Sequence, residues 1–242
     1  MGAGLKHYDA TGGTQITAKA FADGYAGVAQ TAEKFFIENI GDRALVDCEC
    51  RITQSGSSDG STMVRIGADT ATVVPPYGFA AVVSPTGGGG TWGATGTYYY
   101  RATALNGQGE TTGCLEVSAV VDEATKKVTL TWTKPSGATG YKIYRSTSQG
   151  VYTTPVLRAT LGDVATYDDT GGAVGAGAPP AANTTGGAAP AYGTPPALGL
   201  GPLTIGSLAM GKQWVYWANR VIGAGTAEAG NPRTATLEFV ET

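Results

Sequence analysis

The amino-acid sequence predicts an all-β protein with two β-sandwich domains. Charged residues make up only 14% of the 242-residue chain, whereas glycine contributes 38 residues. This composition favours short strands joined by turns over long amphipathic helices. Short runs of period-two alternation recur between clusters of Gly, Pro, Asn and Ser. The chain is long enough to bury two modest hydrophobic cores.

The first informative stretch, residues 34–53, predicts a β-hairpin. An apolar run ends at Ile40, and the turn residues 41–43 separate it from a second run of alternating character. Four residues of the second run share one face of the expected strand, namely Val46, Cys48, Cys50 and Ile52. The other face is mostly polar, which is the pattern of a half-buried strand.

Weaker signals lie on either side of this hairpin. Residues 18–32 contain alanines but also two glycines, so a loop or a brief helix is expected there. Residues 63–68 and 80–83 are expected to form short strands, with a turn signalled by the Pro-Pro sequence within residues 74–78.

Two stretches of biased composition divide the chain. Residues 84–90 are Ser-Pro-Thr followed by four glycines, and residues 171–202 are rich in Gly, Pro and Ala. We expect both to be hinges. Four short strands are expected between them, at residues 97–104, 115–121, 127–133 and 141–145. Regularly spaced short strands of this kind indicate a sandwich.

Two last strands are expected at residues 213–222 and 234–240. They need partners, and the N-terminal hairpin supplies them. The sequence therefore predicts a split β-sandwich docking domain from residues 1–83 and 203–242, an inserted domain at residues 84–186, and a Gly/Pro/Ala-rich linker at residues 187–202.

The middle of the chain closely resembles a fibronectin type III domain. The stretch VTLTWTKPSGATGYKIYRS at residues 128–146 is similar to the tryptophan strand and following tyrosine strand of that family. TYDDTG at residues 166–171 looks like its late strand, and residues 96–110 look like its last hairpin, which here comes first. The resemblance implies an immunoglobulin-like module of circularly permuted order, inserted into the split domain.

The flanking segments look similar to parts of tailed-bacteriophage virion proteins that carry such inserted modules. They are EKFFIENIGDRAL at residues 33–45 and AGNPRTATL at residues 229–237. The resemblance implies a non-enzymatic structural protein of the virion, made in the host cytoplasm. Its split domain would dock to the tail, baseplate or neck, and the immunoglobulin-like module would project outward. A capsid decoration protein on the head shell and a carbohydrate-binding adhesion module stay open as alternatives.

Three sets of residues are expected to matter for such a protein. The core anchors of the inserted domain are Trp132, Tyr141, Tyr98 and Tyr100. The core or partner face of the docking domain comprises Phe35, Ile37, Val46, Ile52, Trp214, Trp217 and Phe239. A ring face suits the apolar face of a sugar, and the candidates for glycan stacking are Tyr99 and Tyr144.

Catalytic, metal and cofactor chemistry is not indicated by the sequence. His7 is the only histidine, so a catalytic triad would depend on it alone. Cys48 and Cys50 supply at most half a zinc site and are expected to be buried thiols, while Cys114 is a minor candidate for a crosslink between subunits. Asp168-Asp169 lacks the ligand spacing of a calcium loop.

The expected partners are other virion proteins, copies of the same chain and, for the adhesion alternative, a host surface glycan. The 19 acidic and 16 basic residues are scattered, with a net charge of −3, so neither nucleic acid nor a membrane surface is expected as a partner. No signal-peptide pattern and no run of eighteen apolar residues occurs in the sequence.

Overall fold

The computed structural model describes residues 4–16, 31–55, 62–186, 198, 202–222 and 234–241. Within these residues the chain is all-β, which confirms the predicted fold class. Every sheet is antiparallel. The described residues include no helix that would cross a membrane.

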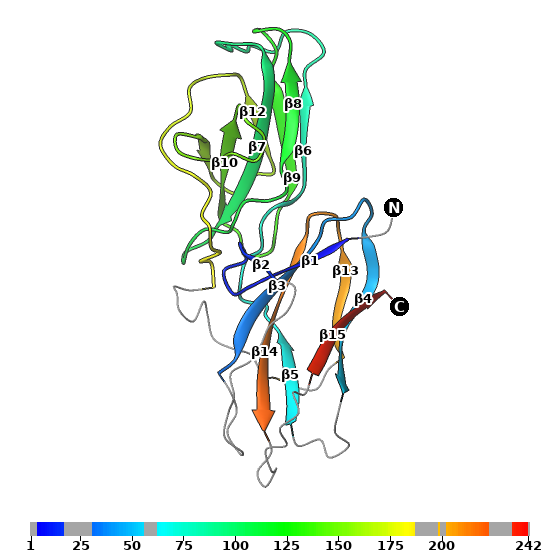
Figure 1. Ribbon diagram of the computed structural model, residues 1–242. Helices are drawn as coiled ribbons and strands as arrows, with labels where there is room; N and C mark the ends of the chain where they lie inside the picture. Colours follow the sequence, from blue (N-terminus) through cyan, green and yellow to red (C-terminus); the bar gives the residue numbers. More distant parts are fainter. Residues whose placement is uncertain are drawn as a thin grey trace.

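One pair of sheets forms the unit that we call the base (Figure 1). Its five-stranded sheet has the order β2 (Gln15–Ile16), β1 (Leu5–Tyr8), β3 (Glu33–Asn39), β14 (Gln213–Ile222) and β5 (Thr62–Ala68). Its three-stranded sheet has the order β13 (Leu203–Leu208), β4 (Leu45–Ser55) and β15 (Thr234–Glu241). The inner faces of the two sheets enclose one hydrophobic cluster.

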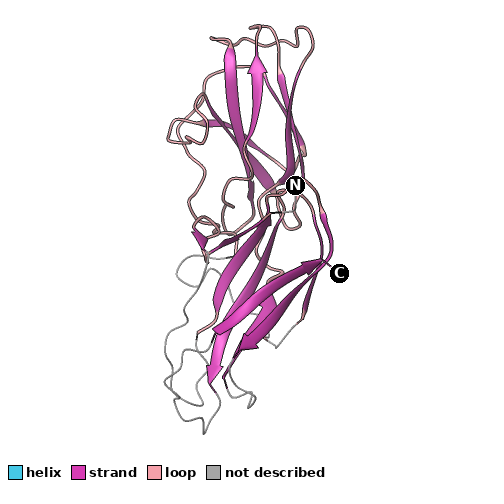
Figure 2. Cartoon of the chain, turned by 45° about the vertical axis from the view of Figure 1, so that its right-hand side comes forward, coloured by secondary structure: helices cyan, strands magenta, loops and turns pink. Residues whose placement is uncertain are grey.

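A second pair of sheets forms the unit that we call the module. Its four-stranded sheet has the order β11 (Leu157–Leu161), β10 (Gly140–Ser146), β7 (Gly96–Leu105) and β8 (Val117–Val121). Its three-stranded sheet has the order β12 (Thr166–Asp169), β9 (Val128–Thr133) and β6 (Tyr77–Val83). A separate hydrophobic cluster fills the space between these sheets. Figures 1 and 2 show the module standing at one end of the base.

The expected hairpin between β3 and β4 does not form. β3 pairs with β1 on one side and β14 on the other, whereas β4 pairs with β13 and β15. The prediction was wrong because alternation identifies a strand but not its partner. Both edges of β3 are occupied, so residues 40–44 carry the chain across to the facing sheet.

A bulge near the start of β4 changes which side chains are buried. Asp47 has a left-handed φ of 48°, and the pairing of β4 with β13 shifts register on both sides of Gly206. The extra residue places Leu45 and Cys48 on the buried face. Val46 is 50% exposed. The expectation that Val46 shares a face with Cys48 was therefore wrong.

The module begins earlier than residue 84. β6 pairs with β9, and Phe79 lies in the module core. The glycine-rich stretch after β6 is a turn at the end of the module away from the base (Figure 1). The Gly90 N–H donates to the Thr125 carbonyl at 2.9 Å, and a β-carbon on Gly90 would lie 1.8 Å from the Lys126 carbonyl oxygen. This stretch is therefore a packed turn and not a hinge.

Several predictions fall outside the described residues. These are most of residues 18–32, where a loop or brief helix was expected, and all of the 187–202 linker except residues 198 and 202. The backbone of Ile52 lies in β4, but its side chain is also outside the described part.

Candidate functional site

The expected anchors of the module lie in its core. Tyr98 and Tyr100 point inward from alternate positions of β7, and Trp132 on β9 meets Tyr141 on β10 with ring centroids 5.3 Å apart. All four are buried. Because alternate residues of a strand share one face, the inward-pointing aromatic residues of the two facing sheets meet between them.

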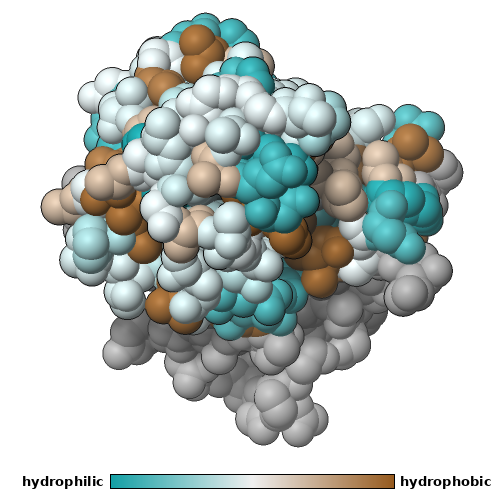
Figure 3. All heavy atoms as spheres, turned by 90° about the horizontal axis from the view of Figure 1, so that it is seen from above, coloured by the Kyte–Doolittle hydropathy of each residue, from teal (hydrophilic) through white to brown (hydrophobic). Residues whose placement is uncertain are grey.

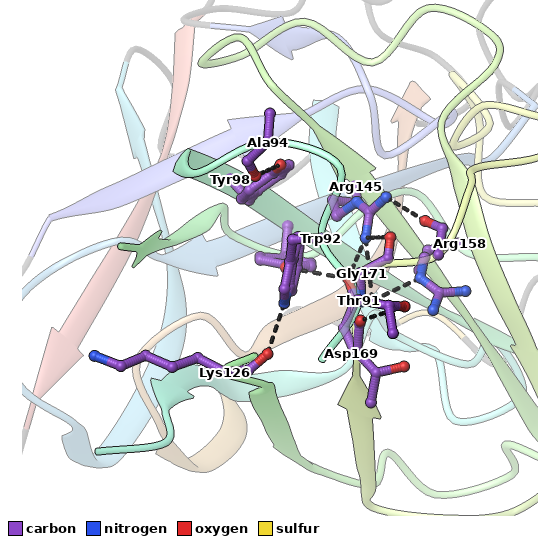
Figure 4. A network of polar contacts seen from close by, with 12 residues as sticks. Thr91, Trp92, Ala94, Tyr98, Lys126, Arg145, Arg158, Asp169 and Gly171 are labelled. Carbon is purple, nitrogen blue, oxygen red and sulfur yellow. Dashed lines mark hydrogen bonds and ion pairs between the residues drawn. The ribbon is translucent and has the colours of Figure 1, made fainter. Parts of the chain in front are cut away.

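A buried charged cluster joins the two sheets of the module (Figure 4). Asp169, at the end of β12, is fully buried. Its carboxylate accepts hydrogen bonds from Arg145 Nη1 at 2.8 Å and Arg158 Nε at 2.6 Å. It also accepts from the Tyr100 hydroxyl and the Gly171 N–H. Two guanidinium groups and two neutral donors thus satisfy one buried carboxylate.

The Arg145 guanidinium lies against two aromatic rings (Figure 4). Its central carbon is 4.9 Å from the Trp92 ring centroid and 5.3 Å from that of Tyr98. It also donates to the carbonyls of Gly171 and Gly172. This arrangement combines cation–π contacts with charge-assisted hydrogen bonds. The cluster fixes the chain after β12 against the four-stranded sheet.

Both carboxylates of the Asp168-Asp169 pair have cationic partners within the module. Asp168 accepts from Lys127 Nζ at 2.7 Å and from the Thr129 hydroxyl at 2.6 Å. In the described part of the chain, no three His, Cys, Asp or Glu side chains are grouped as metal ligands.

The residues expected in the docking domain do not all lie in the base core. Phe35 and Ile37 lie in the base core, and Trp214 and Phe239 pack against it while partly buried. Trp217 is also buried but belongs to the opposite face of β14. The sequence pattern alone does not separate these faces.

A second buried charge lies on that opposite face. Lys34 Nζ donates to the Thr72 hydroxyl at 2.8 Å, lies 3.6 Å from an Asp69 carboxylate oxygen, and is 5.2 Å from the Trp217 ring centroid. Trp217 Nε1 donates to Asp69 at 2.8 Å. Burial lowers the pKa of Lys34. Burial alone would raise the pKa of Asp69, but hydrogen bonds from Thr72 and Trp217 outweigh it and lower that pKa overall.

The seam between base and module is a hydrogen-bonded contact. On the module side, Asn183 Nδ2 and the Thr185 hydroxyl join the two ends of the module by donating to the Val73 carbonyl at 2.8 Å and 3.0 Å. The Asn183 N–H donates to the carbonyl of Thr11 in the base at 2.6 Å. A β-carbon on Gly13 would lie 1.9 Å from the Ala181 carbonyl oxygen. Only glycine therefore fits this approach.

The proposed glycan platform is not formed. Tyr144 is 1% exposed, and its hydroxyl donates to Glu110 at 2.6 Å. Glu110 also pairs with Lys142 Nζ at 2.6 Å, so the segment after β7 covers this part of β10. Tyr99 is partly buried. The expectation that Tyr144 offers a ring face to a sugar was wrong because a loop covers the outer face of its sheet.

The cysteines and the histidine lie in apolar surroundings. None of the three cysteines forms a disulfide bond and all three are buried, and burial raises the pKa of both Cys50 and Cys114 to about 12. The Cys114 thiol is therefore inaccessible to another subunit in this fold. His7 packs edge-on against Phe239 at 4.9 Å, and burial lowers its pKa.

Sequence reasoning missed the structural roles of Asp69, Asp169 and Asn183. Each lies at or after the end of a strand, where polar residues are ordinary, so no local signal marks them. Comparisons with known proteins give no relative, since no protein-family model, curated protein or solved structure matches the chain. The functional conclusion therefore depends on the residues and geometry described above.

Proposed function

We propose that this chain is a non-enzymatic structural component of a tailed-bacteriophage virion, in which the base docks to the tail, baseplate or neck and carries the module as an immunoglobulin-like projection. One observation supports this most strongly. β14 and β15, which follow the module in the chain, pair with β3 and β4, which precede it. The base is thus completed only by strands from both sides of the module.

Both connections to the module lie at the same end of it. The Val73 carbonyl before β6 is hydrogen-bonded to Asn183 and Thr185 after β12. An inserted unit held at one end presents its opposite end and its sides to partners. The hydrogen bond from the Asn183 N–H to the Thr11 carbonyl of the base favours a fixed orientation of the module.

The architecture of the module supports the resemblance to fibronectin type III domains. Sheets of three and four antiparallel strands are typical of immunoglobulin-like sandwiches. Its charged cluster around Asp169 serves packing between the sheets. Partners would be other virion proteins and copies of the same chain, because particle symmetry multiplies weak surface contacts into avidity.

Cryo-electron microscopy of purified particles tests this proposal. The matched control is a particle whose chain has residues 73–185 replaced by a short Gly/Ser linker, so that the difference map locates the module. We expect base density on the tail, baseplate or neck, and module density that disappears in the control. Density on the head shell would instead support decoration of the capsid, and absence of the chain from particles would contradict both roles.

A further inference from the structure

The charged cluster of the module contains more positive than negative charge. Among the described residues, Asp169 is the one carboxylate within ion-pair distance of Arg145 or Arg158. One of the two guanidinium charges therefore has no counter-ion there. Arg145 is buried against two aromatic rings and two carbonyls, whereas the Arg158 side chain is 15% exposed. Because burying a charge without an opposite charge is costly, an anion from outside would bind favourably at Arg158.

Three contacts hold the Arg158 guanidinium at one side of the module. Arg158 lies on β11, an edge strand of the four-stranded sheet, and its Nε donates to Asp169 at 2.6 Å. Its central carbon is 5.8 Å from the ring centroid of Tyr167 on β12. A β-carbon on Gly172 would lie 3.3, 3.7 and 3.9 Å from Arg158 Nη2, Cζ and Nη1, so Gly172 packs over one face of the guanidinium. These contacts orient the side chain before any ligand binds.

The edge of the guanidinium formed by Nη1 and Nη2 is open to a ligand. Neither nitrogen donates a hydrogen bond to a residue that the structure describes. Both point away from Asp169 (Figure 4). Along this edge a guanidinium presents two parallel N–H groups, a fork that matches the two oxygens of a single oxyanion. A ligand that approaches in the plane of the guanidinium would therefore accept two charge-assisted hydrogen bonds.

We propose that the outer edge of Arg158 binds an oxyanion, a carboxylate or a phosphate group, which supplies the second negative charge of the cluster. Both groups offer a pair of oxygens at the spacing of the guanidinium fork. The surface seen from the module end is mostly hydrophilic or neutral, which suits a polar ligand better than an apolar one (Figure 3). This inference does not depend on the virion role proposed above.

Proton–nitrogen NMR of the arginine side chains in the full chain tests the proposal. Sodium acetate and sodium phosphate are titrated separately, with sodium chloride keeping the ionic strength constant. We expect a saturable shift of the Arg158 Nε–H signal with a Kd on the order of millimolar, as suits one paired charged contact. The matched control is the Nε–H signal of Arg51, an exposed arginine that pairs with Glu49. Tighter binding of acetate identifies the ligand group as a carboxylate, and tighter binding of phosphate identifies it as a phosphate.

The backbone amide of Gly172 gives a second readout because this residue packs on the guanidinium. Its signal should shift with the same Kd. Arg158→Lys keeps the positive charge but loses the fork, so it should weaken anion binding at this amide at least about fivefold, whereas Arg51→Lys should leave it unchanged. Three results would overturn the proposal: shifts that stay linear for both anions, equal saturable shifts at Arg51, or an unchanged Kd in Arg158→Lys. The first two are measured on the unaltered chain and do not depend on how a variant folds.

Discussion

Asp169 and Lys34 show how individual residues of this chain place charge inside a β-sandwich. Asp169 pairs with Arg145 and Arg158, and Lys34 contacts the Asp69 carboxylate, the Thr72 hydroxyl and the Trp217 ring. Burying a charge is costly unless hydrogen bonds and an opposite charge replace the water. Both clusters meet that condition, and each connects separate strands of its unit.

Asp169→Asn should strongly destabilise the module. The substitution leaves the Arg145 guanidinium buried without its carboxylate, and breaking a buried pair of this kind costs about 3–5 kcal/mol. Urea unfolding followed by tryptophan fluorescence measures the change in the free energy of unfolding. The control is Asp163→Asn, which removes the exposed pair with Lys134 and should have little effect. Equal effects of the two substitutions would contradict the assigned role of Asp169.

His7 makes stability depend on pH in a defined direction. Burial lowers its pKa below the unfolded value of 6.5, so the unfolded state takes up the proton first as pH falls. The contribution of His7 is therefore fully present above pH 6.5 and is lost as pH falls through 6.5 toward the folded pKa. His7→Phe should reduce the loss of stability between pH 7.5 and 5.5.

Proton NMR measures the His7 pKa directly because the chain has one histidine. We expect an imidazole titration midpoint below 6.5 in the folded protein. A midpoint at or above 6.5, or an unchanged pH dependence of unfolding in His7→Phe, would exclude this account of the residue.

At the scale of strands, local alternation predicted elements well but not their partners. The strand expected at residues 213–222 coincides with β14, and that expected at residues 127–133 differs from β9 by one residue. The sequence pattern wrongly predicted that β3 pairs with β4. The actual partners of these strands come from distant parts of the chain, which compete for the same strand edges. Tyr144 was expected to be exposed but is buried, because a loop from another part of the chain covers it.

The β4 bulge predicts opposite responses from two adjacent residues. Leu45→Ala should destabilise the base by about 2–5 kcal/mol because it empties space in the core. Val46→Ala should change stability by less than about 0.5 kcal/mol because its side chain is half exposed. Urea unfolding of the two variants checks the prediction. A larger loss of stability from Val46→Ala than from Leu45→Ala would contradict the bulge and support the regular alternation expected from the sequence.

At the scale of the whole molecule, the seam determines whether the two units move together. Asn183→Ala should lower stability by about 0.5–1.5 kcal/mol, because it removes one of two donors to the Val73 carbonyl and loosens the segment whose backbone N–H reaches Thr11 of the base. It should also speed amide hydrogen exchange in residues 179–186. The control is Gln108→Ala at an exposed turn position. Unchanged exchange in Asn183→Ala would indicate that the Asn183 side chain does not hold this segment in place.

The central claim is that strands from both sides of the module form one base that does not need the module to fold. The most direct measurement replaces residues 73–185 by a short Gly/Ser linker and compares nitrogen–proton NMR spectra with those of the full chain. The account predicts dispersed base signals and two remaining indole signals, from Trp214 and Trp217, with the latter still shifted by its hydrogen bond to Asp69. A collapsed spectrum typical of an unfolded chain would contradict it.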